Sequence, residues 1–216
     1  MFPRGSHAIN AGMHWLHSVA ATAPSYPAVW LVDTQERPGN LAERSRLRRR
    51  TARLVVARQL GSAGAGCVIA HGPAGQPRID GPGAGGLRIS LATRAGIVAV
   101  ALARQAVGVD VELVDPAGAI PREALHPEER RMLDAVAAGA HPLAFARLWA
   151  AKEAYVKALG TGFLHPPESF AVSLPSPERF HVDDPSRGIA AEGFLRTVEN
   201  GGREALAAAA IVLDRP

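Results

Sequence analysis

The chain contains only two lysines, Lys152 and Lys157, and both fall within one predicted helix. The rest of its 24 Lys and Arg residues are arginines. Lysine is a compact cation whose pKa moves on burial, whereas the arginine guanidinium is a planar group that stays protonated. We therefore expect this helix to need a lysine for chemistry. The alternative is that the two lysines occur there by chance in a chain whose composition favours arginine.

A pair of carboxylates precedes the lysine helix. Asp110 and Glu112 alternate with Val109 and Val111 in a predicted strand, so both acids project from the same face. Two carboxylates held side by side repel each other unless a cation or a proton lies between them. Oxygen ligands of this kind suit Mg²⁺. The pattern by itself also fits an exposed edge strand with two solvated acids.

The lysine helix adds a third carboxylate, because Glu153 lies one helical turn before Lys157. This spacing alone equally suits a surface ion pair. Combined with the strand, it would offer Mg²⁺ three carboxylates, from Asp110, Glu112 and Glu153. Lys157 would then be placed to neutralise a phosphate leaving group. Such a site suits displacement at phosphorus in a substrate that contains a polyphosphate.

Seven arginines fall between Arg44 and Arg58, and the formal net charge is +4. A cluster this dense attracts phosphates or an acidic protein partner. Aromatic residues make up only 5% of the chain and do not interleave with the arginines, which argues against a base-stacking nucleic-acid surface. The alternative is an ordinary solvated helix face.

Hydrophobic periodicity predicts the elements that must position these residues. We expect helices over 41–60, 121–136 and 142–159. We expect strands over 29–32, 87–91, 96–102, 106–112, 168–174, 192–198 and 204–213, although the alanine run of the last segment could instead be helical. Two segments are predicted to be loops. Residues 61–86 are rich in Gly and Pro, and residues 175–188 are rich in Pro and polar residues.

This order of elements predicts an α+β protein of two similar subdomains, each a small, mainly antiparallel sheet packed with helices, with the active site between them. The N-terminal subdomain would span 13–105 and carry the arginine-rich helix. The C-terminal subdomain would span 106–216 and carry the acids and the lysine helix. Residues 1–12 contain Pro-Arg-Gly-Ser-His and are interpreted as a remnant of an expression vector.

Cys67 is the single cysteine, which rules out an internal disulfide and a multi-cysteine metal site. No apolar run approaches the roughly 20 residues of a membrane span, and the N-terminus has no signal-peptide pattern. We expect a cytoplasmic protein that does not associate with membranes.

Two motifs together resemble the paired signature of 4′-phosphopantetheinyl transferases of the surfactin-synthetase type. The first is Gly108-Val-Asp-Val-Glu112, and the second, further along the chain, is Trp149-Ala-Ala-Lys-Glu-Ala-Tyr-Val-Lys157. Further matching segments are Gly75-Gln-Pro77, Ile89-Ser90, residues 96–102, Leu125-His-Pro-Glu-Glu-Arg130 and Ser169-Phe-Ala-Val172.

The resemblance implies transfer of the phosphopantetheine arm of coenzyme A (CoA) to a serine of an apo carrier protein, with release of adenosine 3′,5′-bisphosphate. The acceptor would be an acyl, peptidyl or aryl carrier protein, or a carrier domain of a polyketide, peptide or fatty-acid synthase. The enzyme would be a monomer that binds no nucleic acid.

The resemblance also implies residue roles. Asp110, Glu112 and Glu153 would bind Mg²⁺, or Mn²⁺, with the CoA pyrophosphate. Glu153 would accept the serine proton, and Lys157 would stabilise charge on the leaving phosphate. Glu129 falls where some members have an additional acid, although a helix N-terminal carboxylate is the simpler interpretation. The CoA contacts would be Arg44, Arg49, Arg53, His71, Gln76, Arg78, Ser90 and Lys157.

Two positions depart from the family pattern. Gln76 stands where the family usually has lysine, and Leu91 stands where it usually has histidine. Both missing groups would contact CoA phosphates, so we expect weaker CoA binding or an altered preference between CoA and its dephospho form. The residues that could compensate are His71, Arg78, Arg88 and Arg94.

Three other functions stay open on sequence grounds. The first is a Mg²⁺-dependent hydrolase of a nucleotide diphosphate bond. The second is a degenerate, non-catalytic binder of CoA or of carrier proteins. DNA binding by the arginine helix has the least support.

Overall fold

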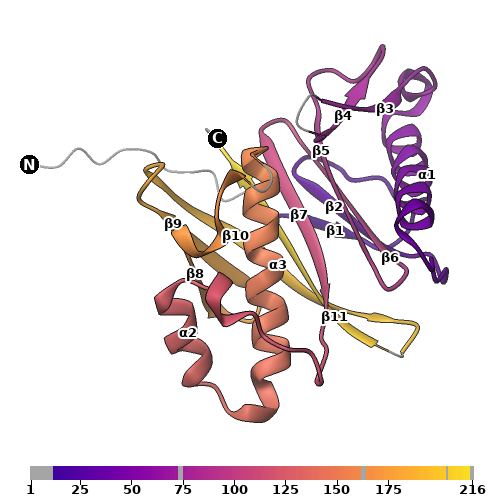
Figure 1. Ribbon diagram of the computed structural model, residues 1–216. Coiled ribbons are helices and arrows are strands. Elements are labelled where there is room, and N and C mark those ends of the chain that lie inside the picture. Colours follow the sequence, from indigo (N-terminus) through magenta and orange to yellow (C-terminus); the bar gives the residue numbers. More distant parts are fainter. Residues whose placement is uncertain (1–11, 73–74, 162–163, 203, 215–216) are drawn as a thin grey trace, which may run out of the picture.

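The computed structural model describes residues 12–72, 75–161, 164–202 and 204–214. Most of the segment interpreted as a vector remnant, residues 1–11, lies outside them. Within the described residues, eleven strands form two sheets (Figure 1). The six-stranded first sheet has the order β1-β2-β6-β5-β4-β3, and the five-stranded second sheet has the order β7-β11-β10-β9-β8. All neighbouring strands are antiparallel except β1 and β2, which are parallel.

The bounds of the elements are as follows. The strands of the first sheet are β1 (His14–Leu16), β2 (Ala28–Asp33), β3 (Val68–His71), β4 (Pro77–Asp80), β5 (Arg88–Arg94) and β6 (Ile97–Ala103). Those of the second sheet are β7 (Ala106–Leu113), β8 (Ala171–Ser176), β9 (Arg179–Asp184), β10 (Ile189–Asn200) and β11 (Glu204–Leu213). The α-helices are α1 (Leu41–Leu60), α2 (Pro127–Asp134) and α3 (His141–Leu159), and the 3₁₀ turns are η1 (Gly61–Gly64), η2 (Arg122–Ala124), η3 (Ala138–Ala140) and η5 (Pro167–Ser169).

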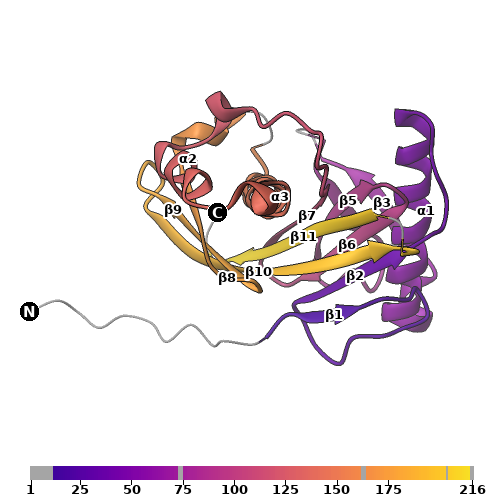
Figure 2. The same cartoon turned by 90° about the horizontal axis from the view of Figure 1, so that it is seen from below.

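The two sheets pack against each other, and the helices cover their outer faces (Figure 2). Strand β6 shows why. Val98, Val100 and Leu102 pack with α1 in one core, while the alanines between them join a core shared with β7 and β11 of the second sheet. Because both faces of β6 are covered, its sequence is apolar throughout and does not alternate. The predicted α+β class, with two mainly antiparallel sheets packed with helices, is confirmed.

The second sheet carries α2 and α3 on its outer face. Leu148, Ala151 and Tyr155 of α3 are buried against this sheet, because their spacing places them on one side of the helix. Strand β11 pairs with β7 on one side and with β10 on the other, so the alternative of a helix over 204–213 is wrong. Its alanine run supplies small side chains between α3 and the first sheet.

Several predicted boundaries are also wrong. The segment 61–86 is not simply a loop but contains η1, β3 and β4, and 175–188 contains β9. These short strands are surrounded by Gly and Pro, which hide the alternation of a few buried residues such as Phe180 and Val182. The helix predicted over 121–136 is split into η2 and α2, because Pro127 disfavours helical geometry at the preceding His126.

None of the helices in the described part of the chain is both long enough and apolar enough to span a membrane.

Candidate functional site

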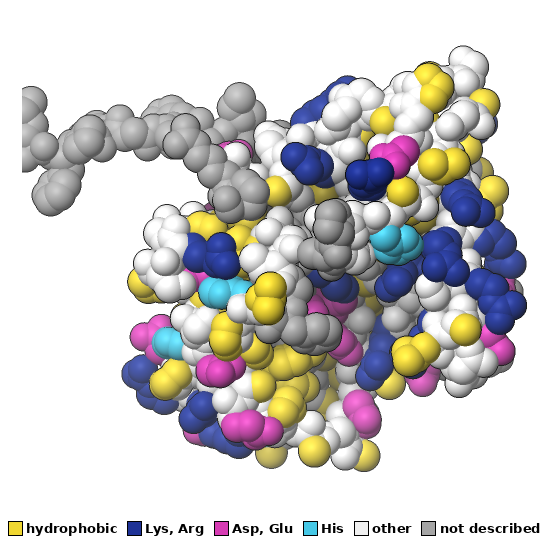
Figure 3. Space-filling view, turned by 45° about the horizontal axis from the view of Figure 1, so that its top comes forward, with side chains coloured by type: hydrophobic (Ala, Val, Ile, Leu, Met, Phe, Trp, Pro, Cys, Tyr) yellow, Lys and Arg dark blue, Asp and Glu magenta, His cyan; other side chains and the backbone are white. Residues whose placement is uncertain are grey.

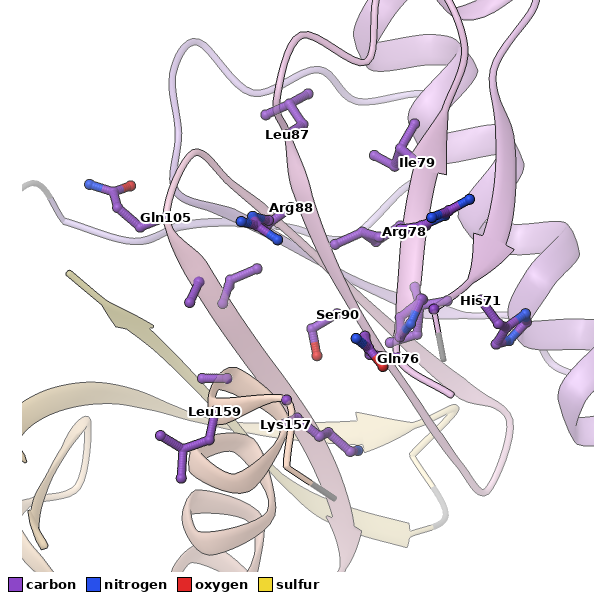
Figure 4. Close-up of a pocket in the computed structure, with 18 of the residues that line it drawn as sticks. His71, Gln76, Arg78, Ile79, Leu87, Arg88, Ser90, Gln105, Lys157 and Leu159 are labelled. Carbon is purple, nitrogen blue, oxygen red and sulfur yellow. The ribbon is translucent and has the colours of Figure 1, made fainter. Parts of the chain in front are cut away.

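A cavity of about 1020 Å³ lies where the two sheets meet the end of α3 (Figure 4). One wall comes from α1, β4 and β5 of the first half of the chain. The opposite wall comes from the start of β7 and from residues 156–160 at the end of α3. Arg48, Arg49, Arg78, Arg88 and Arg104 line it together with Lys157, so the cavity is strongly cationic. Figure 3 shows many basic side chains on one face of the molecule, with acidic side chains among them.

Lys157 links the cavity to the acids of β7. Its Nζ donates to Asp110 Oδ1 at 2.5 Å and to the Val109 carbonyl at 3.4 Å. Asp110 is 6% exposed, and its other carboxylate oxygen, Oδ2, is buried without a hydrogen-bond partner. A buried, unpartnered carboxylate oxygen is costly and marks a place where a cation would be stabilised.

Glu112 and Glu153 share the electrostatics of this group. Burial raises the pKa of Glu112 to about 7, Asp110 and Glu153 add to that rise, and Arg94 and Lys157 oppose it. Burial and Asp110 likewise raise the pKa of Glu153, against the influence of Lys157. The Arg94 Nε lies 3.6 Å from a Glu112 carboxylate oxygen. The structure therefore brings together the three acids and the lysine that the sequence selects.

The donor chemistry of this group fits a hard divalent cation, because such ions prefer carboxylate oxygens. A bound cation would also stabilise the ionised forms of Glu112 and Glu153 and so lower their raised pKa values. Among the described residues, however, no three His, Cys, Asp or Glu side chains are arranged as a ready-made metal site. Glu112 and Glu153 would have to rotate toward an ion beside Asp110.

The residues expected to contact CoA divide into two groups. Six of them line the cavity, namely Arg49, His71, Gln76, Arg78, Ser90 and Lys157. Arg44 and Arg53 do not. The cavity meets α1 only at Arg48 and Arg49, so residues one turn before or after lie beyond it. Arg53 instead lines a separate hollow of about 730 Å³ with Arg49 and other arginines.

Ser90 has a structural partner as well as a place in the cavity. Its Oγ accepts a hydrogen bond from the Val109 backbone N–H at 3.1 Å, which joins β5 to β7, and the residue is 4% exposed. The hydroxyl proton stays available to a ligand. Leu91 is, with Gln76, one of the two positions that depart from the family pattern. It belongs to the core beneath α1, although it also lines the cavity.

Sequence reasoning missed Arg48 and Arg104. Arg104 follows β6 in the short connection between the sheets and contacts the Gly85 carbonyl. Its position next to the predicted boundary between the subdomains, near residue 105, was the sequence feature that could have indicated a role for Arg104 in the cavity. Arg48 was hidden within the arginine run, where only the packing of α1 distinguishes one guanidinium from the next.

The second lysine has a different environment. Lys152 is buried, pairs with Glu129, donates to the Phe170 carbonyl at 2.9 Å and lies 4.1 Å from the centre of the Phe170 ring. Glu129 also accepts from the backbone N–H groups of Val172 and His126, each at 2.8 Å. The pair ties α2, α3 and β8 together. Glu129 is thus a helix N-terminal carboxylate with all its contacts inside the protein.

An acidic group beside a cation-lined cavity is the kind of site that handles a phosphate-containing substrate. Residues 106–210, which hold this acidic group, Lys157 and the second sheet, match the family model of the 4′-phosphopantetheinyl transferase superfamily. The part of the chain that carries the acidic group and Lys157 is therefore similar to this superfamily. No curated protein matches the chain.

Proposed function

We propose that this protein is a phosphopantetheinyl transferase of the surfactin-synthetase type. It transfers the 4′-phosphopantetheine arm of CoA to a serine of an apo carrier protein and releases adenosine 3′,5′-bisphosphate. The acceptor is an acyl, peptidyl or aryl carrier, the protein acts as a cytoplasmic monomer, and the division into subdomains falls near residue 105. The observation that carries the proposal is the contact of Lys157 with Asp110 at the edge of the cationic cavity, within the matched domain.

Each residue of the group has a role in this reaction. Asp110, Glu112 and Glu153 would hold Mg²⁺, which supplies a positive charge for the diphosphate oxygens. Glu153 accepts the proton of the carrier serine as its oxygen bonds to the β-phosphorus of CoA. The bond from this phosphorus to the bridging oxygen breaks, and Lys157 stabilises the charge that develops on the departing α-phosphate. The cationic wall of the cavity binds the nucleotide part of CoA.

The test is intact-mass analysis of an apo carrier protein incubated with the protein, CoA and Mg²⁺. We expect the carrier to gain one phosphopantetheine. Glu153→Gln should slow this transfer by about 100-fold or more, because a general base is lost, and EDTA should abolish it. Glu199→Gln, an exposed acid of β10, is the matched control and should transfer normally.

Other outcomes would replace the proposal. Hydrolysis of CoA to adenosine 3′,5′-bisphosphate without any carrier would indicate a Mg²⁺-dependent hydrolase. CoA binding with no transfer to any of several carrier types would indicate a non-catalytic binder.

A further inference from the structure

An arginine of the first sheet pairs with one of the three acids. Strand β5 ends at Arg94, and the Nε of its guanidinium lies 3.6 Å from a carboxylate oxygen of Glu112 in β7. The side chain of Arg94 is 46% exposed, and that of Glu112 is 24% exposed. Arg94 does not belong to the lining of the cavity, unlike Arg88 of the same strand. In the described part of the chain its partner is therefore an acid of β7 and not a residue of the cavity wall.

The backbones that carry this ion pair are both held in place. The carbonyl of Ala95, in the turn after Arg94, accepts hydrogen bonds from the side chains of Arg37 and Asn200. Asn200 is buried at the end of β10, so these contacts attach the turn to the second sheet. The backbone of Glu112 is held by the pairing of β7 with β11. The two charges are therefore separated or joined by rotation of their side chains.

The direction of the strands places Arg94 and Asp110 on opposite sides of Glu112. Ser90 of β5 accepts a hydrogen bond from the Val109 backbone N–H of β7. Further along β5, Arg94 meets Glu112, so the two strands run side by side in the same direction. Asp110 lies on the Val109 side of Glu112, about 7 Å back along β7. A cation beside Asp110 would therefore draw the Glu112 carboxylate away from Arg94.

Two cationic side chains of the protein already contact these acids. Lys157 contacts Asp110 Oδ1, while Arg94 contacts Glu112. Asp110 Oδ2 is buried without a hydrogen-bond partner among the described residues, so it offers a ligand position to a further cation. A divalent cation at this position would be repelled by the guanidinium charge of Arg94 and would also need the carboxylate with which Arg94 pairs.

We propose that Arg94 is a positioning residue that competes with the divalent cation for Glu112 and so lowers the affinity of the acids for this cation. The inference rests on the proposed function, which assigns the cation to Asp110, Glu112 and Glu153. An ion pair as exposed as that of Arg94 and Glu112 is weak, so an ion with two charges can displace it. Glu112 joins the cation only after its contact with Arg94 has opened.

The experiment measures binding of Mn²⁺ to the protein alone at pH 8, from the electron paramagnetic resonance signal of the free ion. Neither CoA nor a carrier protein is present, so the result does not depend on transfer activity. Arg94→Gln should tighten Mn²⁺ binding about two- to fivefold, because a weak competing ion pair is removed. Arg179→Gln removes an ion-paired arginine of similar exposure from β9, three strands away from β7, and should leave the affinity unchanged.

A double-mutant cycle tests whether the effect of Arg94 passes through Glu112. Glu112→Gln should weaken Mn²⁺ binding, because it removes a carboxylate ligand. In this background Arg94→Gln should change the affinity by less than about twofold, since the carboxylate for which Arg94 competes is gone. A purely structural role of Arg94 would not produce this dependence on Glu112.

The results separate the role of Arg94 from the proposed function. If the wild type binds Mn²⁺ but Arg94→Gln binds it equally or more weakly, the competition is wrong while the metal site stands. If Arg94→Gln tightens binding equally in both backgrounds, Arg94 acts on the ion by its charge alone and does not hold Glu112. If neither the wild type nor Arg94→Gln binds Mn²⁺, the metal site of the proposed function fails as well. Urea unfolding of each variant establishes that a change in affinity is not a change in fold.

Discussion

At the scale of single residues, the two lysines show that one sequence signal can have two physical causes. Lys157 is half-buried and contacts Asp110 at the edge of the cavity, whereas Lys152 is buried against Glu129 and Phe170. Burial lowers the pKa of Lys152, and Glu129 opposes that change. The compact ammonium of Lys152 fits between three elements of the core, where it contacts Glu129 and Phe170. This role is one of packing, distinct from any role in chemistry.

Glu129→Gln should destabilise the protein by about 3–5 kcal/mol, because it leaves the Lys152 charge buried without its partner. Urea unfolding measures this change. Glu128→Gln, at the exposed neighbouring position, should stay within about 0.5 kcal/mol of the wild type. A Glu129→Gln variant of normal stability that binds less Mg²⁺ would instead make Glu129 a residue of the metal site.

At the scale of elements, the contact between β7 and α3 decides whether the site can form. Gly108 lies where the strand approaches the helix most closely, and a Cβ at this position would sit 1.7 Å from the Ala154 carbonyl oxygen. The glycine of the Gly-Val-Asp-Val-Glu motif thus has a packing role. It allows β7, which carries Asp110 and Glu112, to lie directly against the helix that carries Glu153 and Lys157.

Gly108→Ala should therefore cost about 3 kcal/mol or more, because the helix has to move away from the strand. Thermal and urea unfolding measure the loss, and Mg²⁺ binding should weaken with it because the acids separate. Gly139→Ala is the matched control, since a Cβ at Gly139 meets no atom within 4 Å, and its stability should be close to that of the wild type. Equal stability of the two variants would show that β7 and α3 do not pack in this way.

At the scale of the whole molecule, two sheets are joined face to face and the cavity opens at one end of their junction. The junction uses small side chains such as Ala99, Ala101 and Ala208, which let the sheets approach closely. Polar contacts close its edges, among them Ser90 with Val109 and Arg37 with Asn200. Because each half supplies one wall, the cavity depends on the stability of the entire fold.

The dependence of that stability on pH should involve Asp184 of β9. Burial alone would raise the pKa of this carboxyl, but hydrogen bonds from Ser186, Tyr155 and His165 outweigh burial and lower it. A lowered folded-state pKa contributes stability that is fully present above the unfolded value of about 3.9 and is lost as the pH falls below it.

Asp184→Asn should therefore flatten the acid limb of the stability curve between about pH 5 and pH 2, and it should be less stable than the wild type at pH 7. Urea unfolding at a series of pH values measures both effects. The exposed neighbour Asp183 provides the control substitution, Asp183→Asn, which should leave the acid limb unchanged. An acid limb of unchanged slope in Asp184→Asn would overturn this assignment.

Much of this architecture could be predicted from sequence, and the reason is local. The helix α1 has the predicted bounds and α3 begins only one residue before its prediction, because helical periodicity and terminal glycines act over neighbouring residues. Asp110 and Glu112 share a face because strands alternate, and Glu153 and Lys157 share a face because helices repeat every 3.6 residues. The residue types of the two motifs resemble the paired signature of phosphopantetheinyl transferases, and that resemblance implies roles for these side chains.

What only the tertiary structure decided depends on contacts between distant segments. Local pattern does not distinguish Arg48 and Arg49 from Arg44 and Arg53, since all four lie in one helix. The distinction arises from which turn of α1 meets the cavity. Likewise, Arg94 reaches Glu112 only because β5 lies beside β7. Burial and charge proximity are properties of the packed chain, and they determine which of its many arginines can meet one ligand.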